Sequence, residues 1–349
     1  IPRLRRFLRE LERVAAGQTA LSRVGKIAAV SQAILKGDYS SAEAKLVLAE
    51  QTASSELHTV PQARPIEFAL FHPRGPYTAT ESLQHYFRAF MYLSELRATP
   101  DEYRLLDGDA ALRQSWRAWV ETQSALLFDT RVSLLFEPDR PLPPYVQKDC
   151  VPAEVRAHPR LFPLAFGIDS EIWSGVIAHS GAPPGCQVPE RPFPSGLDLL
   201  TALGSDEAQS IQSSDYANIP ALRDAHDRLR RRFASPLSAD RVAESWLRLV
   251  QLLATDRLVP EGIEPLLWRR RLLQTALGTW TNYRHTTVLL SENIAAECGG
   301  FGPTFEELTS EPLRGAVDPL PESWEQLART LGILAEHSGK LLPDQPELG

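Results

Sequence analysis

Apolar residues recur at helical spacing through most of the chain. Near the N-terminus one stripe repeats every three or four residues, and it consists of Leu21, Val24, Ile27, Ser31 and Ile34. This spacing places side chains on one face of an α-helix. Similar patterns predict further helices at 109–128, 196–203, 219–233, 238–254 and 321–337. The chain is therefore predicted to be all-α.

Two of the expected helix starts carry the capping-box pattern. Ser40 is followed three residues later by Glu43, and Thr78 is followed in the same way by Glu81. In such a box each of the two side chains bonds a backbone N–H group of the first turn. We therefore expect helices to begin at these positions. The second helix carries His85 on the same polar face as Glu81.

One helix, from about Trp268 to Glu292, is expected to form the centre of the fold. Its apolar residues cover much of the predicted circumference, which is typical of a helix buried on several sides. Arg284 would then need a carboxylate or carbonyl partner, because an unpaired buried charge is strongly destabilising. Arg284 either ties this helix to a neighbour or binds an anionic ligand beside His285.

The stretch from about residue 137 to residue 195 has a different composition. It contains twelve of the 28 prolines, and proline fixes φ and lacks a backbone donor. We expect an irregular excursion packed on the helical body, inside one domain that spans 1–349. The expected apolar anchors of this excursion are Phe162, Phe166, Ile172, Trp173 and Val176.

Composition excludes several classes of protein. A hydrophobic content of 43% is enough for a sizeable core, and the formal net charge of −7 argues against a nucleic-acid-binding protein. Arginine clusters such as Arg230, Arg231 and Arg232 are interpreted as solvated faces or ion pairs. No apolar run reaches the ~20 residues of a transmembrane helix, so peripheral association is the one membrane contact left open. The chain begins at Ile1 and its only methionine is Met91, so either a leader was removed or the sequence is a fragment.

Three cysteines allow one disulfide, and we expect it between Cys150 and Cys186 if the protein is exported; in a reducing compartment free thiols are expected. These two cysteines with His158 and His179 could also hold zinc, but their spacing matches no standard finger. No other metal-binding pattern, phosphate loop, dinucleotide fingerprint or nucleophile elbow is present, so no metal or other cofactor is predicted.

Several segments resemble a known family. The segments that carry the resemblance are His72–Thr78, Tyr86–Met91, Arg191–Asp198, Ala202–Ser205, Gln274–Trp280, Tyr283–His285 and Gly315–Pro319. In this order they are similar to the signatures of the bacterial and archaeal family catalogued as domain of unknown function 3160 (DUF3160). The resemblance covers nearly the whole chain. It implies an exported or lipid-anchored protein and no established reaction.

Two positions depart from the family pattern. Pro76 stands where the family has His, and Thr286 stands where it has Asp. The loss of two polar groups favours a non-catalytic protein. The resemblance implies that it lies in the periplasm, at the cell surface or in the extracellular space. We expect it to serve as a structural or binding subunit for a partner protein, a surface polymer or a larger assembly. The alternative is a hydrolase of peptides or glycans, with a cleft lined by Arg284, His285, His85 and Glu81.

Overall fold

The fold is almost entirely helical in the part of the chain that the structure, a computed structural model, describes. This part comprises residues 1–60, 65–126, 136, 161, 168–178, 188, 191, 193–237, 242–255, 259–286 and 320–341. Within it the only sheet is an antiparallel pair, β1 (Thr52–Ser54) and β2 (Pro65–Glu67), in which Ala53 lies opposite Ile66. The predicted all-α class is confirmed.

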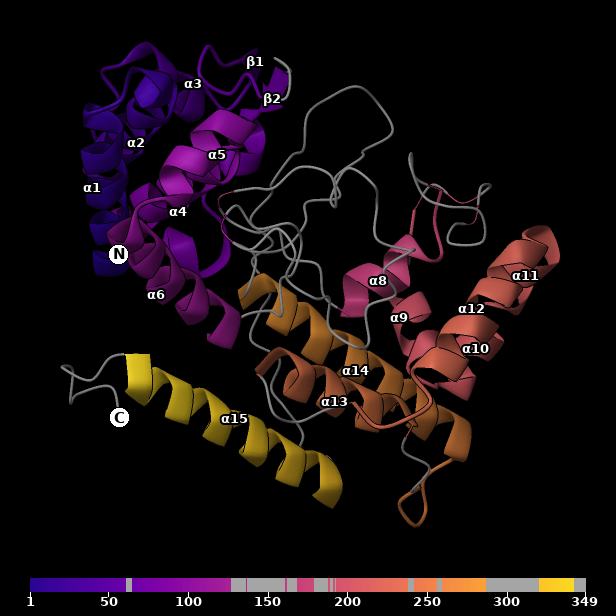
Figure 1. Cartoon of the computed structure of the whole chain (residues 1–349). Coiled ribbons are helices and arrows are strands. Elements are labelled where there is room, and N and C mark those ends of the chain that lie inside the picture. The colour runs from indigo at the N-terminus through magenta and orange to yellow at the C-terminus, as the bar shows by residue number, and fades with distance from the viewer. Residues whose placement is uncertain are drawn as a thin grey trace.

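The N-terminal part of the chain forms one end of the molecule (Figure 1). Its helices are α1 (Pro2–Ala16), α2 (Ser22–Leu35), α3 (Ala42–Ala49), α4 (Glu81–Ser94), α5 (Pro100–Asp107) and α6 (Ala110–Leu126), with three 3₁₀ turns, η1 (Thr19–Leu21), η2 (Phe68–Phe71) and η3 (Gly75–Thr78). The predicted apolar stripe is buried, from Leu21 to Ile34, and it faces α1 and α4. Trp116 and Trp119 of α6 close this core.

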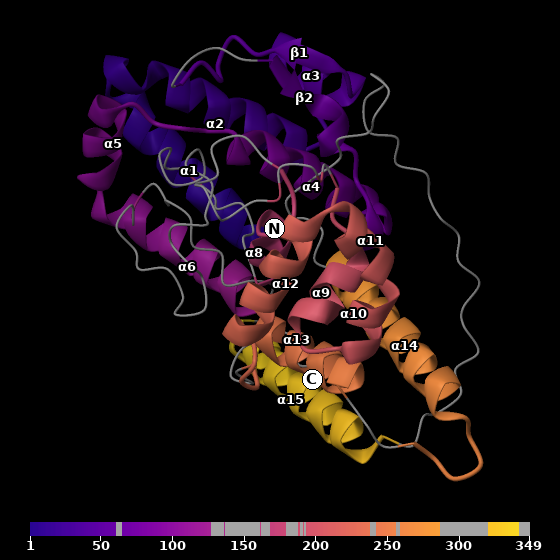
Figure 2. The ribbon, with the colours of Figure 1, turned by 90° about the vertical axis from the view of Figure 1, so that its right-hand side faces the viewer.

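The C-terminal part forms a second core. Its helices are α8 (Ile168–Ser174), α9 (Gly196–Ala202), α10 (Asp206–Ile211), α11 (Ser213–Asn218), α12 (Pro220–Arg232), α13 (Val242–Thr255), α14 (Pro265–Thr286) and α15 (Pro321–Leu341). α13 packs between α14 and α15, and α15 also touches α6 (Figures 1 and 2). Arginines of this half form ion pairs, as the sequence indicated: Arg230 binds Asp206 at 2.7 Å, and Arg232 binds Glu171 at 2.6 Å.

The two cores meet at α13. Ala243 belongs to the first core and Leu247 to the second, while Trp246 packs against both. The Trp246 indole donates to the Thr279 carbonyl at 3.1 Å and stacks on the Tyr283 ring, with centroids 5.7 Å apart. Residues of α13 therefore pack against the cores of both halves of the chain.

The expected central helix, α14, is buried along one face and not on several sides. α14 buries one face, with Trp268, Leu272, Ala276 and Tyr283 at four- and seven-residue spacing. Its other face is exposed at positions that include Leu267, Gln274, Gly278 and Asn282. The prediction rested on apolar residues that occur around much of the helix, but neighbouring described helices cover only one side of it.

Three local predictions need correction. α3 is capped by Ser41, whose side chain accepts from Ala44 N, and not by Ser40. α4 is capped in the same way by Thr80, two residues after Thr78. Within the proline-rich stretch α8 is a regular helix, and it buries Ile172 completely. The expected anchors Phe162 and Phe166 lie outside the described residues.

Gly37 ends α2 with a positive φ of 78°, which is strained for any residue that has a Cβ. A Cβ there would also lie 2.8 Å from His85 Nε2. We expect Gly37→Ala to lower the free energy of unfolding by about 1–2 kcal/mol, as measured by urea denaturation. Gly17→Ala is the matched control, because Gly17 has a φ of −89° and open space around it. Equal stabilities of the two variants would contradict this prediction.

Candidate functional site

Asp198, on the first turn of α9, is a fully buried carboxylate bound by four groups. Oδ2 accepts from the Ser195 backbone N at 2.6 Å and from Arg191 Nη1 at 2.7 Å. Oδ1 accepts from Gln212 Nε2 at 2.7 Å and from His226 Nε2 at 3.0 Å. Each oxygen thus has two donors, and Asp198 joins α9 to the segment before it, to the end of α10 and to α12.

The Asp198 cluster continues outward to Tyr216 of α11. The Tyr216 hydroxyl lies 2.8 Å from His226 Nδ1. Because a carboxylate only accepts, we assign the His226 proton to Nε2, which leaves Nδ1 to accept from Tyr216. The three side chains form a Tyr–His–Asp sequence of hydrogen bonds, an arrangement that in enzymes can activate a hydroxyl group.

The pKa values argue against such activation here. Burial would raise the pKa of Asp198, but hydrogen bonds from His226 and Arg191 outweigh it and hold that pKa below its ordinary value. Burial, and then the charge of Asp198, raise the pKa of Tyr216 to about 12. The Tyr216 hydroxyl is therefore harder to deprotonate than that of an ordinary tyrosine. Its bond to His226 holds α11 against α12.

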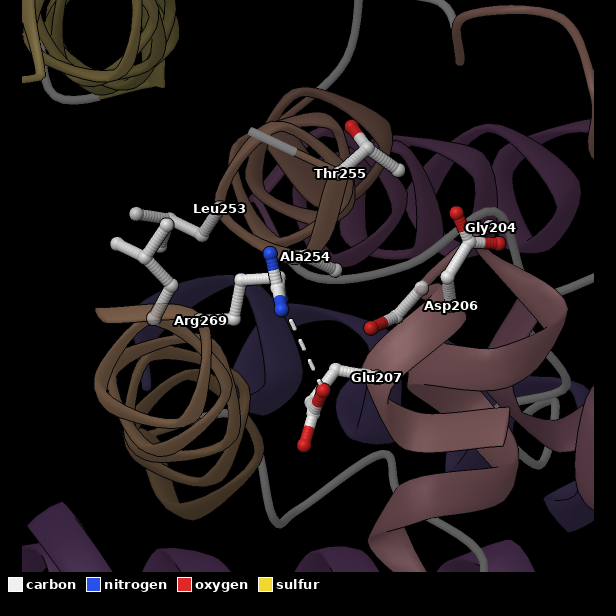
Figure 3. A pocket seen from close by; sticks show the side chains of 9 residues that line it. Gly204, Asp206, Glu207, Leu253, Ala254, Thr255 and Arg269 are labelled. Carbon is white, nitrogen blue, oxygen red and sulfur yellow. Dashed lines mark ion pairs between the residues drawn. The ribbon is translucent and has the colours of Figure 1, made fainter. Parts of the chain in front are cut away.

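A cavity of about 480 Å³ lies between α10 and the adjoining ends of α13 and α14 (Figure 3). Its lining includes Gly204, Glu207, Thr255 and Arg269. Arg269 points across the cavity towards Glu207, with Nε 3.8 Å from a carboxylate oxygen. Asp206 also lines the cavity, and Arg230 binds it at 2.7 Å, so each of the two acids of the lining has a basic partner.

Arg284, the predicted ligand-binding residue, lies at a buried ion pair. Its Nε is 3.3 Å from Asp169 Oδ2, and Trp280 Nε1 donates to the same oxygen at 3.1 Å. Asp169 is completely buried in α8, and the guanidinium lies over the Trp173 ring at 6.0 Å. Arg284 thus has the carboxylate partner that its position requires, and the pair ties α14 to α8.

The other candidates, Glu81 and His85, lie on α4. His85 Nδ1 is 3.0 Å from the Tyr39 hydroxyl, and His85 Nε2 is 3.4 Å from a carboxylate oxygen of the exposed Glu81. The contacts of His85 thus come from the N-terminal half, whereas those of Arg284 come from α8 and α14. The side chain of His285 lies outside the described residues, so a joint cleft with Arg284 stays a prediction.

The first family-like segment packs on α4. His72 Nδ1 lies 2.8 Å from Glu50, which also binds Arg88 at 3.1 Å. The Arg74 guanidinium lies over the Phe87 ring at 5.5 Å, and burial lowers the pKa of Arg74 to about 10. These residues connect the turns before α4 to α3 and to α4 itself. Their contacts are therefore structural.

Sequence reasoning missed the Asp198 cluster, although one signal was readable. Ser195 and Asp198 have the spacing of a capping box, and the structure shows that box in full. Their partners Gln212 and His226 are distant in sequence, and no local pattern indicates them. The same holds for Asp169 as the partner of Arg284.

Two predicted cysteine interactions cannot be placed. Cys150 and Cys186 lie outside the described residues, as do His158 and His179, so the disulfide and the zinc alternative stay untested. Among the residues that are described, no three His, Cys, Asp or Glu side chains are grouped as metal ligands. No described helix combines the length and apolar character needed to span a bilayer.

Comparison with known proteins supplies the family. No curated protein and no solved structure matches the chain. The family described as protein of unknown function (DUF3160) matches residues 17–132 and 142–344, which is most of the chain. The segments Arg191–Asp198 and Ala202–Ser205, which hold the Asp198 carboxylate and line the cavity, fall within this match. The chain therefore belongs to the DUF3160 family.

Proposed function

We propose that this protein is a non-catalytic binding subunit of the cell envelope that docks a partner protein on the outer face of α15. The observation that carries the proposal is the reversed polarity of this helix. A surface helix normally packs its apolar side on the protein and turns its polar side to water. In α15 the buried side chains include the polar Gln326 and Thr330, whereas Trp324 and Leu331 are half exposed on a side that also carries charged residues.

The inner face of α15 packs on α13 through hydrogen bonds. Gln326 Nε2 donates to the Ser245 carbonyl at 3.1 Å and contacts Ser245 Oγ at 2.8 Å. The hydroxyls of Ser245 and Thr330 are 2.7 Å apart, and all three side chains are buried. Fully satisfied polar seams of this kind hold elements in one defined position. The seam fixes α15 in place, and Leu327 packs beside it against the second core.

The outer face of α15 carries an apolar stripe, which we define as Trp324, Ala328, Leu331 and Ala335. Trp324 and Leu331 are each 49% exposed, and both alanines are also exposed. Covering apolar surface is favourable by roughly 25 cal/mol per Å². Of the partners considered, a protein fits this stripe better than a surface polymer, because polysaccharides present mostly hydroxyl groups.

Two further observations support a non-catalytic role. The charged groups of the Asp198 cluster and the Asp169–Arg284 pair bind one another and connect helices. The raised pKa of Tyr216 makes deprotonation of the hydroxyl nearest to a catalytic arrangement harder. For the envelope location, the support is the exported character that resemblance to this family implied.

The test compares two exposed leucines. Leu331 of the stripe and Leu48 of α3 have nearly equal exposure, 49% and 50%. Tagged wild-type protein, Leu331→Lys and Leu48→Lys are each isolated from the cell envelope of the producing organism after mild cross-linking. We expect the wild type and Leu48→Lys to retain a stoichiometric partner chain and Leu331→Lys to lose it. The proposal is refuted if the wild type and both variants are all isolated without a partner chain.

A further inference from the structure

A second cavity, of about 520 Å³, is formed by residues of α10, α11 and α12. Its volume is within the range of roughly 300–1,000 Å³ that is usual for small-molecule sites. Its described lining is mostly polar and includes Asp206, Gln209, Ser210, Ser213, Tyr216 and Arg223. A lining of this kind suits a ligand that is itself rich in hydrogen-bonding groups.

Arg223, near the start of α12, supplies a cation to this cavity. Its guanidinium lies over the Tyr216 ring, 5.9 Å from the ring centroid, and it forms no ion pair with any residue that the structure describes. Because a guanidinium is planar, a ring against its face leaves the N–H groups at its edge able to bind a carboxylate through two parallel hydrogen bonds. Arg223 therefore presents a positive charge and several donors to a ligand.

Tyr216 is held in place from the interior of the protein. Its hydroxyl lies 2.8 Å from His226 Nδ1, and His226 Nε2 is 3.0 Å from the buried Asp198. These bonds fix the ring on which the guanidinium lies, so less side-chain freedom is lost when a ligand binds. The Asp198 cluster thus supports one wall of the cavity.

Neutral groups of the cavity are able to bind hydroxyl groups. The side chains of Ser210 and Ser213 are exposed, and neither has a hydrogen-bond partner in the part of the chain that the structure describes. Each serine hydroxyl both donates and accepts, as a sugar hydroxyl does. Gln209 Nε2 adds a donor, since its contact with Asp227 is long, at 3.5 Å.

Asp206 limits the negative charge that the cavity can accept. It is the one carboxylate among the described lining residues, and Arg230 binds it at 2.7 Å. This pairing leaves the single charge of Arg223 to be balanced by a ligand. A carboxylate supplies one negative charge, whereas a phosphate monoester carries about 1.5 to 2 at pH 7 and would place the excess near Asp206. The cavity therefore favours a carboxylate.

We propose that this cavity binds a sugar acid, that is, a pyranose that carries one carboxylate. The carboxylate binds Arg223, and the ring hydroxyls bind Ser210, Ser213 and Gln209. This site lies on α10, α11 and α12, whereas the proposed docking surface lies on α15. The inference therefore goes beyond the proposed function and does not depend on it.

Titration of the purified full chain with glucuronate, followed by ligand-observed NMR at low ionic strength, tests the proposal. We expect the wild type to bind glucuronate with a dissociation constant in about the millimolar range or below. Arg223→Gln should weaken binding at least about tenfold, because it removes the charge-assisted hydrogen bonds. Arg231→Gln is the matched control, since Arg231 is an exposed arginine of the same helix outside the cavity lining.

Two further sugars identify the group that is bound. Glucose lacks the carboxylate and glucose 6-phosphate carries a phosphate, so both should bind the wild type at least about tenfold more weakly than glucuronate. Lack of glucuronate binding up to about 10 mM overturns the proposal, and so does equal binding by Arg223→Gln and the wild type. Glucose or glucose 6-phosphate that binds as tightly as glucuronate overturns the assignment of the carboxylate. None of these outcomes bears on α15, because the docking test uses other variants and another readout.

Discussion

Asp198→Ala is expected to lower the free energy of unfolding by about 3–5 kcal/mol, the usual cost of removing one partner from a buried charged pair. The change leaves Arg191 and His226 buried without the carboxylate that binds them at 2.7 and 3.0 Å. It also removes the acceptor for Ser195 N at the start of α9. Urea denaturation followed by circular dichroism measures the loss.

Asp101→Ala is the matched control for this substitution. Asp101 also forms an ion pair, with Arg104 at 2.6 Å, but its side chain is 77% exposed. Exposed pairs contribute roughly 0.2–1 kcal/mol, so the control should stay close to the wild type. Similar losses in the two variants would show that burial of the Asp198 cluster is not what makes it stabilising.

Acid is expected to destabilise the protein through His58, which packs edge-on against the Tyr92 ring at 4.6 Å in the N-terminal core. Burial lowers the pKa of His58 from 6.5 to about 4. Because the folded-state pKa is the lower one, the stability is complete above pH 6.5 and falls as the pH approaches 4. A shift of this size corresponds to about 3 kcal/mol.

His58→Phe isolates this contribution from the carboxylates that titrate in the same range. The variant keeps an aromatic ring against Tyr92 but binds no proton. Urea denaturation at pH 7 and near pH 4 should therefore show a loss of stability about 3 kcal/mol larger in the wild type than in the variant. Equal losses would mean that His58 accepts its proton in the folded protein at little cost.

Helical periodicity predicted the fold class because the buried stripes of α2 and α6 repeat at the spacing that packing requires. Helix boundaries were less predictable. Ser40, Ser41, Thr78 and Thr80 are all chemically able to cap a helix, and the path of the backbone determines which of them does so. α8 was missed because prolines surround it, although Ile168–Ser174 itself contains none. α5 was missed even though Thr99 and Glu102 form a capping box around Pro100.

For the buried charged residues, the sequence predicted that a partner is needed but not which residue it is. A buried Arg284 requires a carboxylate, but its identity as Asp169 depends on how α8 packs against α14. Likewise, Asp198 could be placed on a helix start from its spacing to Ser195. That His226 would reach it from α12 is a property of the tertiary fold. Burial of α14 was overestimated because a sequence does not show how many neighbours a helix has.

Trp246 has a consequence for how the whole chain responds to change. Its ring packs against both cores, so neither half can expand without disturbing contacts in the other. Loosening in the N-terminal helices is thus transmitted through α13 to α14 and α15. By the same linkage, any molecule that binds only the folded form of one half also protects the other half from unfolding.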